Sequence, residues 1–513
     1  MSARGLRVHE DTYLDSLLIM STTVTMDERP GIRWAAAVMA DDRGLADLGK
    51  AGFDDLDGLG ANDLVLAAVG DDDEAVQAAL DAGREIAFGE RQDGRAGAAE
   101  APPADLREAV RREPDVTVAV VSVAGEHAAL EAHHALTEGL HVLLFSDNVP
   151  VEEEVELKER ANRLGRLVMG PGAGTAVLGG TGLGFANVLD GDRPGRGVGV
   201  VAAAGTGAQE VSALLDRWGV RVTSVIGVGG RDLTAAVEGR MARSAVRALV
   251  DDDETDVVLL VSKPPDPAVA ETVLGECGRT PAVAVFLGLD GVEPRAGVRL
   301  VPTLEAGVRA AAELLGGGAP PPETGLAPRV DDAIGRLGKG RTAVRGLFSG
   351  GTLCYEAQYV LERAGVPAWS NEPLRPDHGL PAPDGSSVLL DLGAEEYTRG
   401  RPHPMIDGSK RLELLREAGG DPSVAVVLLD VVLGHGAHAD PAGQLAPVCA
   451  DVMADGGPQV VAYVLGTERD PQGYSAQREV LEKAGCVVPE TNAAAARVAA
   501  ALATRRPDAL DEP

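Results

Sequence analysis

The chain has 513 residues and a formal net charge of −32, from 47 Lys and Arg against 79 Asp and Glu. A surface this acidic repels phosphodiester backbones and anionic lipids, which argues against nucleic-acid and membrane partners. The length predicts several domains, the four cysteines form no CxxC pair, and no apolar run reaches the roughly 20 residues of a membrane span. The N-terminus lacks the basic-then-apolar pattern of a signal peptide. Together, these features predict a cytoplasmic protein.

Residues 1–88 predict a small α+β domain of ferredoxin-like type. The expected strands are Asp15–Met20, Ile32–Met39 and Asp63–Val69, and the expected helices are Leu45–Ala51 and Asp72–Phe88. Gly, Ala, Pro and charged residues without periodicity come next, so residues 89–112 are predicted to be a linker.

Residues 113–190 alternate between strand and helix patterns, which is typical of a parallel sheet. Val116–Val123 is an almost continuous apolar, β-branched run, as expected for a strand covered on both faces. No GxGxxG motif follows it, which argues against a nicotinamide cofactor. The elements expected after it are the helix Glu126–Glu138, the strand His141–Phe145, the helix Val151–Leu164, the strand Leu167–Gly170 and a glycine-rich loop at 170–175.

An internal repeat covers much of the remaining chain. Residues 205–220 (GTGAQEVSALLDRWGV) align without a gap to residues 351–366 (GTLCYEAQYVLERAGV). Each copy lies among apolar strand patterns, so the repeat predicts two doubly wound domains, residues 191–322 and 330–513. The Gly- and Pro-rich stretch Gly316–Pro322 joins them. The expected strands are Val198–Ala202, Val257–Val261 and Ala282–Leu287 in the first copy, and Leu347–Phe348, Val424–Leu429 and Val460–Leu465 in the second.

Each copy joins a strand to a helix through a tight glycine turn. Such a turn directs unpaired backbone N–H groups and the positive helix end to one point, which suits a phosphate. The alternative is that Gly-Thr serves only as a helix cap. The predicted phosphate- or substrate-binding residues are Gly205, Thr206, Gly207, Gly350, Gly351, Thr352 and Glu356.

A third glycine turn contains Gly229, Gly230 and Arg231. The glycines permit close backbone approach to a ligand, and Arg231 offers a forked donor for an anion. A plain turn with a solvated arginine is the alternative.

An insert at residues 373–404, present in the second copy alone, leads into a run with functional side chains. Arg401, His403 and Asp407 lie there on a loop stiffened by two prolines, which suits a carboxylate or phosphate ligand. We expect Arg401 and His403 to be catalytic or anion-binding residues and Asp407 to contact the substrate.

The strand Val424–Leu429 is followed by a loop with Gly434, Gly436 and His438. Open α/β sheets bind ligands at the carboxyl ends of their strands, so this loop is a candidate site with His438 as a catalytic residue. A surface loop histidine is the alternative. His435 and His438 have an HxxH spacing, yet no third ligand neighbours them in sequence, and no metal site is predicted.

These motifs resemble the FdrA family. The matching stretches are GTGAQEV (205–211), GVGGRDL (227–233), RGLFSGGTLCYEA (345–357), the DLG…GRPHPMID run (391–407) and DVVLGHGAHADPAG (430–443). More distantly, the chain is similar to succinyl-CoA synthetase with its subunits partly fused. That likeness implies a CoA-binding-like Rossmann domain over 113–190, followed by two flavodoxin-like succinyl-CoA-ligase domains. The candidate bound molecules are CoA and phosphate.

The chain also departs from the synthetase pattern. The synthetase carries a phosphorylated histidine in its first ligase domain, facing two helix N-termini whose matching places here are Gly205–Gly207 and Gly434–Gly436. This chain has no histidine between His141 and His378 and no region resembling an ATP-grasp domain. The resemblance therefore implies that this chain does not phosphorylate itself from ATP.

The FdrA resemblance implies a subunit of an oxamate carbamoyltransferase of allantoin degradation. It would exchange carbamoyl between oxalurate and phosphate, giving oxamate and carbamoyl phosphate. The implied partners are other subunits of a hetero-oligomeric enzyme and small anionic substrates. Two alternatives stay open: an acyl-CoA synthetase subunit, succinate–CoA ligase-like, whose ATP-grasp part lies on another chain, and a non-catalytic regulatory or assembly subunit.

Overall fold

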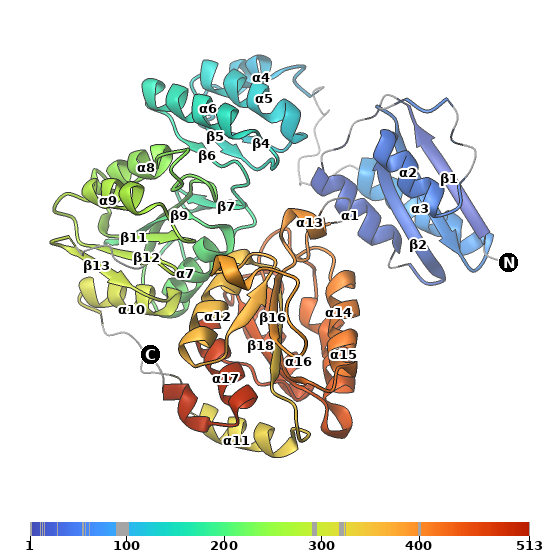
Figure 1. Ribbon diagram of the computed structural model, residues 1–513. Coiled ribbons are helices and arrows are strands. Elements are labelled where there is room, and N and C mark those ends of the chain that lie inside the picture. Colours follow the sequence, from blue (N-terminus) through green and yellow to red (C-terminus); the bar gives the residue numbers. More distant parts are fainter. Residues whose placement is uncertain are drawn as a thin grey trace. The chain divides into compact units, whose positions relative to one another are not determined.

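The computed structural model (Figure 1) divides into two compact units, residues 1–109 with 400–402 and residues 110–399 with 403–513. No described helix is both long and apolar enough to cross a membrane. The residues that the structure describes are 3–10, 12, 14, 16–27, 29–53, 56, 58–60, 62–88, 102–289, 295–317, 323, 325–398 and 402–511.

The first unit is built on an antiparallel sheet with helices on both faces. Its elements are β1 (Ala3–His9), α1 (Ser16–Asp27), β2 (Ile32–Met39), α2 (Asp42–Lys50), β3 (Leu64–Gly70) and α3 (Asp73–Phe88). The strand order is β1-β3-β2. Met26 and Leu80 are buried between the sheet and the helices α1 and α3, and Leu48 of α2 is buried on the other face. This arrangement agrees with the predicted small α+β domain.

The predicted strand at Asp15–Met20 is wrong, because residues 16–20 belong to helix α1. Thr22 and Met26, four residues apart, are both fully buried. A Cβ on Gly83 of α3 would lie 3.5 Å from Thr22 Cγ2, so α1 packs closely on α3. Burial at this spacing is the helical period, and packing on α3 overrides the local preference of the β-branched residues. The strand β1 was not predicted.

A three-stranded parallel sheet of order β4-β5-β6 follows, as the alternating pattern predicts. Before it, α4 (Leu106–Arg112) forms a helix inside the stretch predicted as a linker, of which residues 89–101 lie outside the described part. The elements are β4 (Val118–Val121), α5 (Gly125–Thr137), β5 (His141–Leu144), α6 (Val151–Leu164) and β6 (Val168–Met169).

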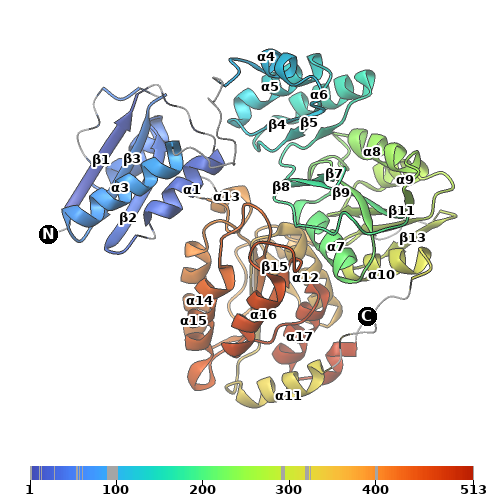
Figure 2. The ribbon, with the colours of Figure 1, turned by 180° about the vertical axis from the view of Figure 1, so that it is seen from behind.

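The next sheet has seven strands in the order β13-β12-β11-β9-β10-β7-β8. Its parallel part runs from β13 to β10, with α7 and α10 on one face and α8 and α9 on the other (Figure 2). The elements are β7 (Thr175–Leu178), β8 (Thr181–Gly184), β9 (Gly197–Ala203), α7 (Gly205–Arg217), β10 (Val222–Gly227), α8 (Arg240–Val250), β11 (Thr255–Ser262), α9 (Pro267–Gly275), β12 (Ala282–Phe286), β13 (Val298–Val301) and α10 (Leu304–Leu314).

The hairpin β7–β8 differs from the sequence prediction. Its strands lie within residues 113–190 but pair with β10 of the seven-stranded sheet. Gly179 and Gly180 form the two-residue turn with φ of 55° and 77°, a conformation that favours glycine. Sheet pairing thus moves the end of the small parallel domain to before Thr175. The other domain boundaries stay predictions.

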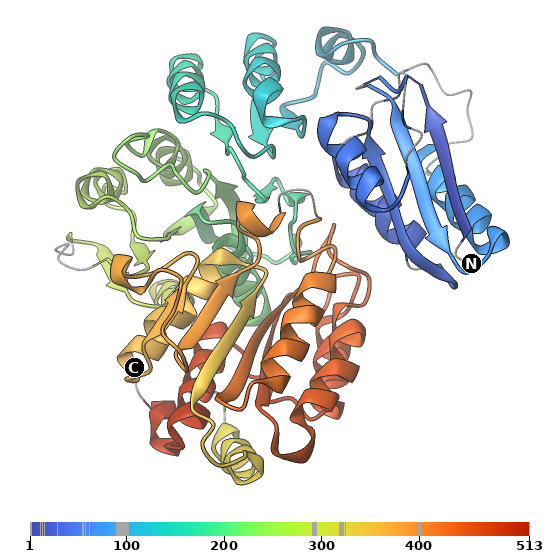
Figure 3. The ribbon, with the colours of Figure 1, turned by 45° about the vertical axis from the view of Figure 1, so that its right-hand side comes forward.

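The last sheet along the chain is a five-stranded parallel sheet of order β15-β16-β14-β17-β18. Helices α12 and α17 cover one face, and α14, α15 and α16 cover the other (Figure 3). The elements are α11 (Leu326–Arg336), β14 (Ala343–Phe348), α12 (Gly351–Arg363), β15 (Ala368–Ser370), β16 (Ser387–Asp391), α13 (Glu395–Thr398), α14 (Ser409–Gly420), β17 (Val424–Val432), α15 (Pro441–Met453), β18 (Gln459–Leu465), α16 (Tyr474–Lys483) and α17 (Asn492–Thr504).

The two larger sheets share one layer of helices. Helices α7 and α10 of the seven-stranded sheet pack against α12 and α17 of the five-stranded sheet, and one apolar core runs through all four. Figures 1 and 2 both show α7 beside α12. This shared layer brings the two repeated segments together. Part of the predicted connection Gly316–Pro322, residues 318–322, lies outside the described residues.

Candidate functional site

The two repeated segments are both strand-turn-helix, as predicted. Helix α7 begins at Gly205 directly after β9, and α12 begins at Gly351 just after β14. Within the described part of the chain, neither helix start has a side-chain cap. The positive ends of both helices therefore keep unpaired backbone N–H groups that can receive an anion.

The two helix starts touch each other. A Cβ on Gly207 would lie 2.9 Å from Thr352 Cγ2, and a Cβ on Gly350 would lie 2.5 Å from Thr206 Cγ2. These two glycines are therefore required for close helix contact. Gly205 differs, because a Cβ there would meet nothing within 4 Å. The predicted phosphate residues thus divide into a packed set and one open position.

This division predicts opposite effects for two neighbouring substitutions. Gly207→Ala is expected to lower the free energy of unfolding by about 1–3 kcal/mol, because its methyl group overpacks the contact with Thr352. Gly205→Ala is expected to raise it by about 0.5 kcal/mol, because alanine restricts the unfolded chain and fits the helix without a clash. Urea unfolding of both variants measures the difference. Equal losses at the two positions would contradict the packing seen here.

Asp430, in β17, holds the turn that precedes α12. Its carboxylate accepts hydrogen bonds from the backbone N–H groups of Ser349 (2.8 Å) and Gly350 (2.9 Å), and forms an ion pair with Arg411 at 2.9 Å. Burial raises the pKa of Asp430, while Arg411 and Ser349 oppose the rise. Asp430 is fully buried and supports the turn from beneath.

Two residues that the sequence did not single out, Lys263 and Asp391, lie at the start of α12. Lys263 directly follows β11, and Asp391 ends β16, so both stand at carboxyl ends of parallel strands. Lys263 Nζ lies 4.8 Å from the centre of the Tyr355 ring and 3.9 Å from the Glu372 carboxylate. Asp391 is 5% exposed, and its burial raises its pKa to about 6 against the opposing charge of Lys263.

The loops of the predicted catalytic residues adjoin, although Arg401 lies outside the described residues. The backbone N–H of His438 donates to the carbonyl of Met405 at 2.8 Å, which joins its loop to that of His403. The His438 ring contacts residues of its own loop and of α15. Its Nδ1 accepts from the Asp440 N–H at 3.0 Å, and its Nε2 lies 3.0 Å from the Gln444 amide.

The His403 ring lies nearer to the helix starts. A Cβ on Gly393 would be 2.8 Å from His403 Nε2 and 3.2 Å from Asp391 Oδ1, so the imidazole and the carboxylate flank that glycine. Its centre is 6.0 Å from that of Phe185. Burial, aided by Arg411, lowers the pKa of His403 to about 4. The ring is therefore neutral at neutral pH.

The remaining glycines of the prediction lie against other loops. Gly434 has φ of 120°, and a Cβ there would be 2.9 Å from the carbonyl oxygen of Ala186. Gly436 has φ of 82° and faces Phe185 at a comparable 2.8 Å. Gly229 approaches the backbone of Gly170, whereas a Cβ on Gly230 would meet nothing within 4 Å. Close approach between chain segments thus accounts for these glycines except Gly230.

Two predicted anion-binding side chains have partners within the protein. Asp407 accepts from the N–H and hydroxyl of Ser409, both at 2.9 Å, at the start of α14. Arg231 donates to the Glu154 carboxylate at 2.9 Å and to the Val149 carbonyl at 2.7 Å. These contacts hold loops in place, and a ligand role for either residue stays a prediction.

Glu154 belongs to a buried charge network between α6 and the loop after β10. Lys158 donates to Glu154 at 2.7 Å, to Asp232 at 2.8 Å and to the Val228 carbonyl at 2.9 Å. All three charged side chains of the two ion pairs are 0% exposed. Asp232 also accepts from the Ala242 N–H at 2.8 Å in α8. The network links the small parallel sheet to the seven-stranded sheet.

The glutamates shared by the repeat, Glu210 and Glu356, are fully buried inside the helix layer. Glu356 accepts from the Leu304 N–H at 2.6 Å and from the Asn492 side chain at 2.8 Å, at the starts of α10 and α17. The Tyr463 hydroxyl donates to Glu210. Burial raises the pKa of Glu210 to about 8, with a further rise from Glu356, and raises that of Glu356 to about 7.

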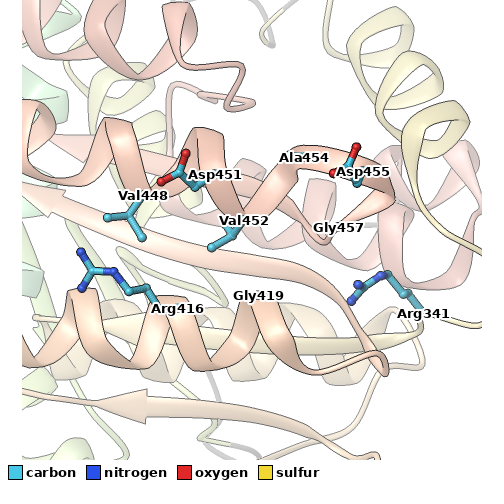
Figure 4. Close-up of a pocket in the computed structure, with 9 residues that line it drawn as sticks. All are labelled: Arg341, Arg416, Gly419, Val448, Asp451, Val452, Ala454, Asp455 and Gly457. Atoms are coloured by element: carbon cyan, nitrogen blue, oxygen red, sulfur yellow. The ribbon is translucent and has the colours of Figure 1, made fainter.

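A cavity of about 390 Å³ lies at the opposite end of the five-stranded sheet (Figure 4). Arg341 is held there by the carbonyl groups of Gly456 and Val424 at 3.1 and 2.8 Å. The cavity faces the amino ends of the strands, away from the helix starts, so it is separate from the candidate site. Its lining residues are Arg341, Arg416, Gly419, Val448, Asp451, Val452, Ala454, Asp455 and Gly457.

Two family models match parts of the chain. A model described as CoA-ligase matches residues 347–502, and one described as AllF, heavy metal-associated domain, matches residues 1–105. The first cysteine is Cys277, so the N-terminal segment contains no thiol for a heavy metal.

Whole-chain comparisons agree with these matches. YahF of Escherichia coli (strain K12), an uncharacterized protein, is 34% identical over 498 residues, or 94% of this chain and 95% of YahF. The α subunit 2 of the ADP-forming succinate–CoA ligase of Archaeoglobus fulgidus is 30% identical over 188 residues, or 36% of this chain and 63% of that subunit. Among solved structures, the match to PH0766 from Pyrococcus horikoshii covers 77% of this chain and 86% of PH0766 at 15% identity, with a TM-score of 0.30. By its nearly full-length likeness to YahF and its CoA-ligase segment, the chain belongs to the FdrA family, within the superfamily of nucleotide-diphosphate-forming acyl-CoA synthetases.

Proposed function

We propose that this chain is the subunit of an oxamate carbamoyltransferase that holds the acyl phosphate during transfer. The observation that carries the proposal is the meeting of two uncapped helix starts, at Gly205 and Gly351. The carbamoyl group of carbamoyl phosphate is attached to a phosphate whose charge grows as the bond to carbon breaks. The positive helix end at Gly205 stabilises such a leaving group, and Lys263 lies beside the second start at Gly351.

The reaction needs no covalent enzyme intermediate. In one direction, the oxamate nitrogen attacks the carbamoyl carbon, and phosphate leaves to give oxalurate. This route agrees with the lack of any histidine between His141 and His378, the interval where the synthetases carry their phosphorylated residue. Arg401, His403 and His438 remain the proposed substrate-binding or catalytic residues of the second repeat, with phosphate or CoA as the bound molecules.

An acyl-CoA synthetase subunit is the second candidate. It is favoured by the CoA-ligase match at residues 347–502 and by the likeness to a succinate–CoA ligase α subunit. In that case an ATP-grasp chain would be a partner, and other subunits of a hetero-oligomeric enzyme are expected in either case.

The test uses the chain assembled with its partner subunits. We expect carbamoyl phosphate plus oxamate to give oxalurate and phosphate without ATP or CoA. We also expect that labelled ATP leaves no acid-labile, base-stable phosphate on the chain. A complex without this chain serves as the control, because activity that persists there would reduce the chain to a regulatory or assembly subunit. ATP-dependent CoA ester formation, with labelling of His435 or His438, would establish the synthetase instead.

A further inference from the structure

The two helix starts differ in what lies beside their first residues. At Gly205 of α7, a Cβ would meet nothing within 4 Å. At Gly351 of α12, a Cβ would overlap Oδ2 of Asp391 and lie 2.9 Å from Nζ of Lys263. The repeat therefore presents one helix start with free space at its first residue and one that lies beside a carboxylate of the protein itself.

Asp391 is fixed in this position by its surroundings. Its backbone N–H donates to the Asn371 side chain at 2.9 Å, and its carbonyl accepts from the same amide at 3.0 Å. Oδ1 accepts from the Gly393 N–H at 2.9 Å. Among the residues that the structure describes, no donor is hydrogen-bonded to Oδ2, the oxygen that faces the start of α12. One oxygen thus anchors the carboxylate and the other is available for a proton.

The charges around Asp391 suit a group that gains and loses a proton. Burial raises its pKa to about 6, the carboxylates of Glu372 and Asp430 add to the rise, and Lys263 and the Gly393 N–H oppose it. A carboxyl group with this pKa is ionised at neutral pH yet basic enough to accept a proton. The titratable groups that face it are Lys263, Cys354, Tyr355, Glu372, His403 and Asp430.

We propose that Asp391 takes the proton from the attacking nitrogen, while the open start of α7 at Gly205 receives the phosphate. This inference rests on the proposed carbamoyl transfer. The lone pair of the oxamate nitrogen forms the new C–N bond to the carbamoyl carbon. The C–O bond to phosphate breaks with its electron pair on the phosphate oxygen, and one N–H proton passes to Asp391 Oδ2. Asp391 then loses this proton to solvent.

The same group serves the reverse direction. When phosphate attacks oxalurate, the nitrogen of oxamate is the leaving group and needs a proton, which protonated Asp391 supplies. The positive end of α12 and Lys263 keep this buried carboxylate ionised in the absence of substrate.

The activity test compares Asp391→Asn with the wild-type complex and with Asp384→Asn, the same change at an exposed loop position. Asparagine can still accept from Gly393, so the fold is expected to persist. Transfer from carbamoyl phosphate to oxamate should be slower by about 10²- to 10⁴-fold in Asp391→Asn and unchanged in Asp384→Asn. The wild-type rate should fall below a pH of about 6, and the Asp391→Asn profile should lack this fall.

A binding test separates the two helix starts without relying on turnover. Inorganic phosphate is titrated into the full chain, its Asp391→Asn variant and a Gly205→Asp variant. Aspartate at residue 205 fills the open helix end with a carboxylate, as Asp391 fills the other. We expect phosphate binding to persist in Asp391→Asn and to be lost in Gly205→Asp.

The outcomes distinguish this inference from the proposed function. Carbamoyl transfer at the wild-type rate and with an unchanged pH profile in Asp391→Asn would refute the role of Asp391 and leave the carbamoyltransferase intact. Phosphate binding that survives in Gly205→Asp would refute the assignment of the anion to α7. A wild-type complex without carbamoyl transfer would overturn the proposed function, and the proton step with it.

Discussion

A Lys158→Met variant is expected to lose about 3–5 kcal/mol of its free energy of unfolding, the cost typical of breaking a buried ion pair. Lys158 donates to Glu154, Asp232 and a backbone carbonyl, and its side chain is 0% exposed. Methionine has a similar volume, so the loss arises from the missing ammonium rather than from a cavity. Among the described residues, Asp232 is left buried without a cation, and Glu154 keeps only Arg231. Chemical unfolding of the two proteins measures it.

The chain contains a matched control for this experiment. Lys483 and Glu479 form an ion pair of the same helical spacing and the same 2.7 Å length as Lys158 and Glu154, but their side chains are 72% and 64% exposed. Solvent already screens that pair, so Lys483→Met should cause no measurable change. Similar losses in both variants would show that burial does not decide the strength of the Lys158 network.

Glu210→Gln is expected to remove a large part of the pH dependence of stability. The pKa of Glu210 is about 8 in the folded protein, against 4.5 for an ordinary glutamate. Between these values the unfolded chain releases a proton that the folded protein keeps, so the wild type becomes less stable as pH rises. The stability is fully present below pH 4.5 and is lost progressively up to a pH of about 8.

The size of the effect follows from the pKa difference. At about 1.4 kcal/mol for each pKa unit, Glu210 should account for roughly 5 kcal/mol of the fall between acidic and mildly basic pH. Glutamine cannot titrate, and its carbonyl oxygen can still accept from Tyr463. Urea unfolding across this pH range should therefore give a flatter curve for Glu210→Gln, with a remaining slope from Glu356. Glu271→Gln, on the exposed side of α9, is the control, and a slope as flat in that variant would contradict the assignment to Glu210.

The alternating pattern of the sequence predicted the parallel sheets because strands buried on both faces are continuous apolar runs. The repeat predicted both helix starts, since a glycine turn after such a strand leaves little choice of conformation. Helix α1 was missed because its residues favour strands locally and become helical by packing on Gly83 of α3. The Gly179-Gly180 pair is typical of a two-residue hairpin turn. The hairpin was not predicted because the surrounding sequence was interpreted as alternating strands and helices.

The candidate site was less predictable than the fold. Lys263 and Asp391 are single polar residues at strand ends, and nothing in their spacing links them, because they lie in different sheets and meet only through the shared helix layer. Glu210 was visible as the repeat partner of Glu356 but was not chosen. Its depth in the core depends on how the two domains pack. Arg231 and Asp407 were predicted to bind the substrate from their residue types. In the structure, Arg231 contacts Glu154, far away in the sequence, and Asp407 contacts the nearby Ser409. Residue type alone does not reveal such contacts.

Through the continuous core of α7, α10, α12 and α17, the two repeated domains bury their apolar helix faces against each other. Each would, by itself, display a pair of apolar helices to water, a surface that favours aggregation. Because both domains are on one polypeptide, they are made in equal amounts. The tether also gives each domain a millimolar effective concentration for the other, as is typical of short linkers.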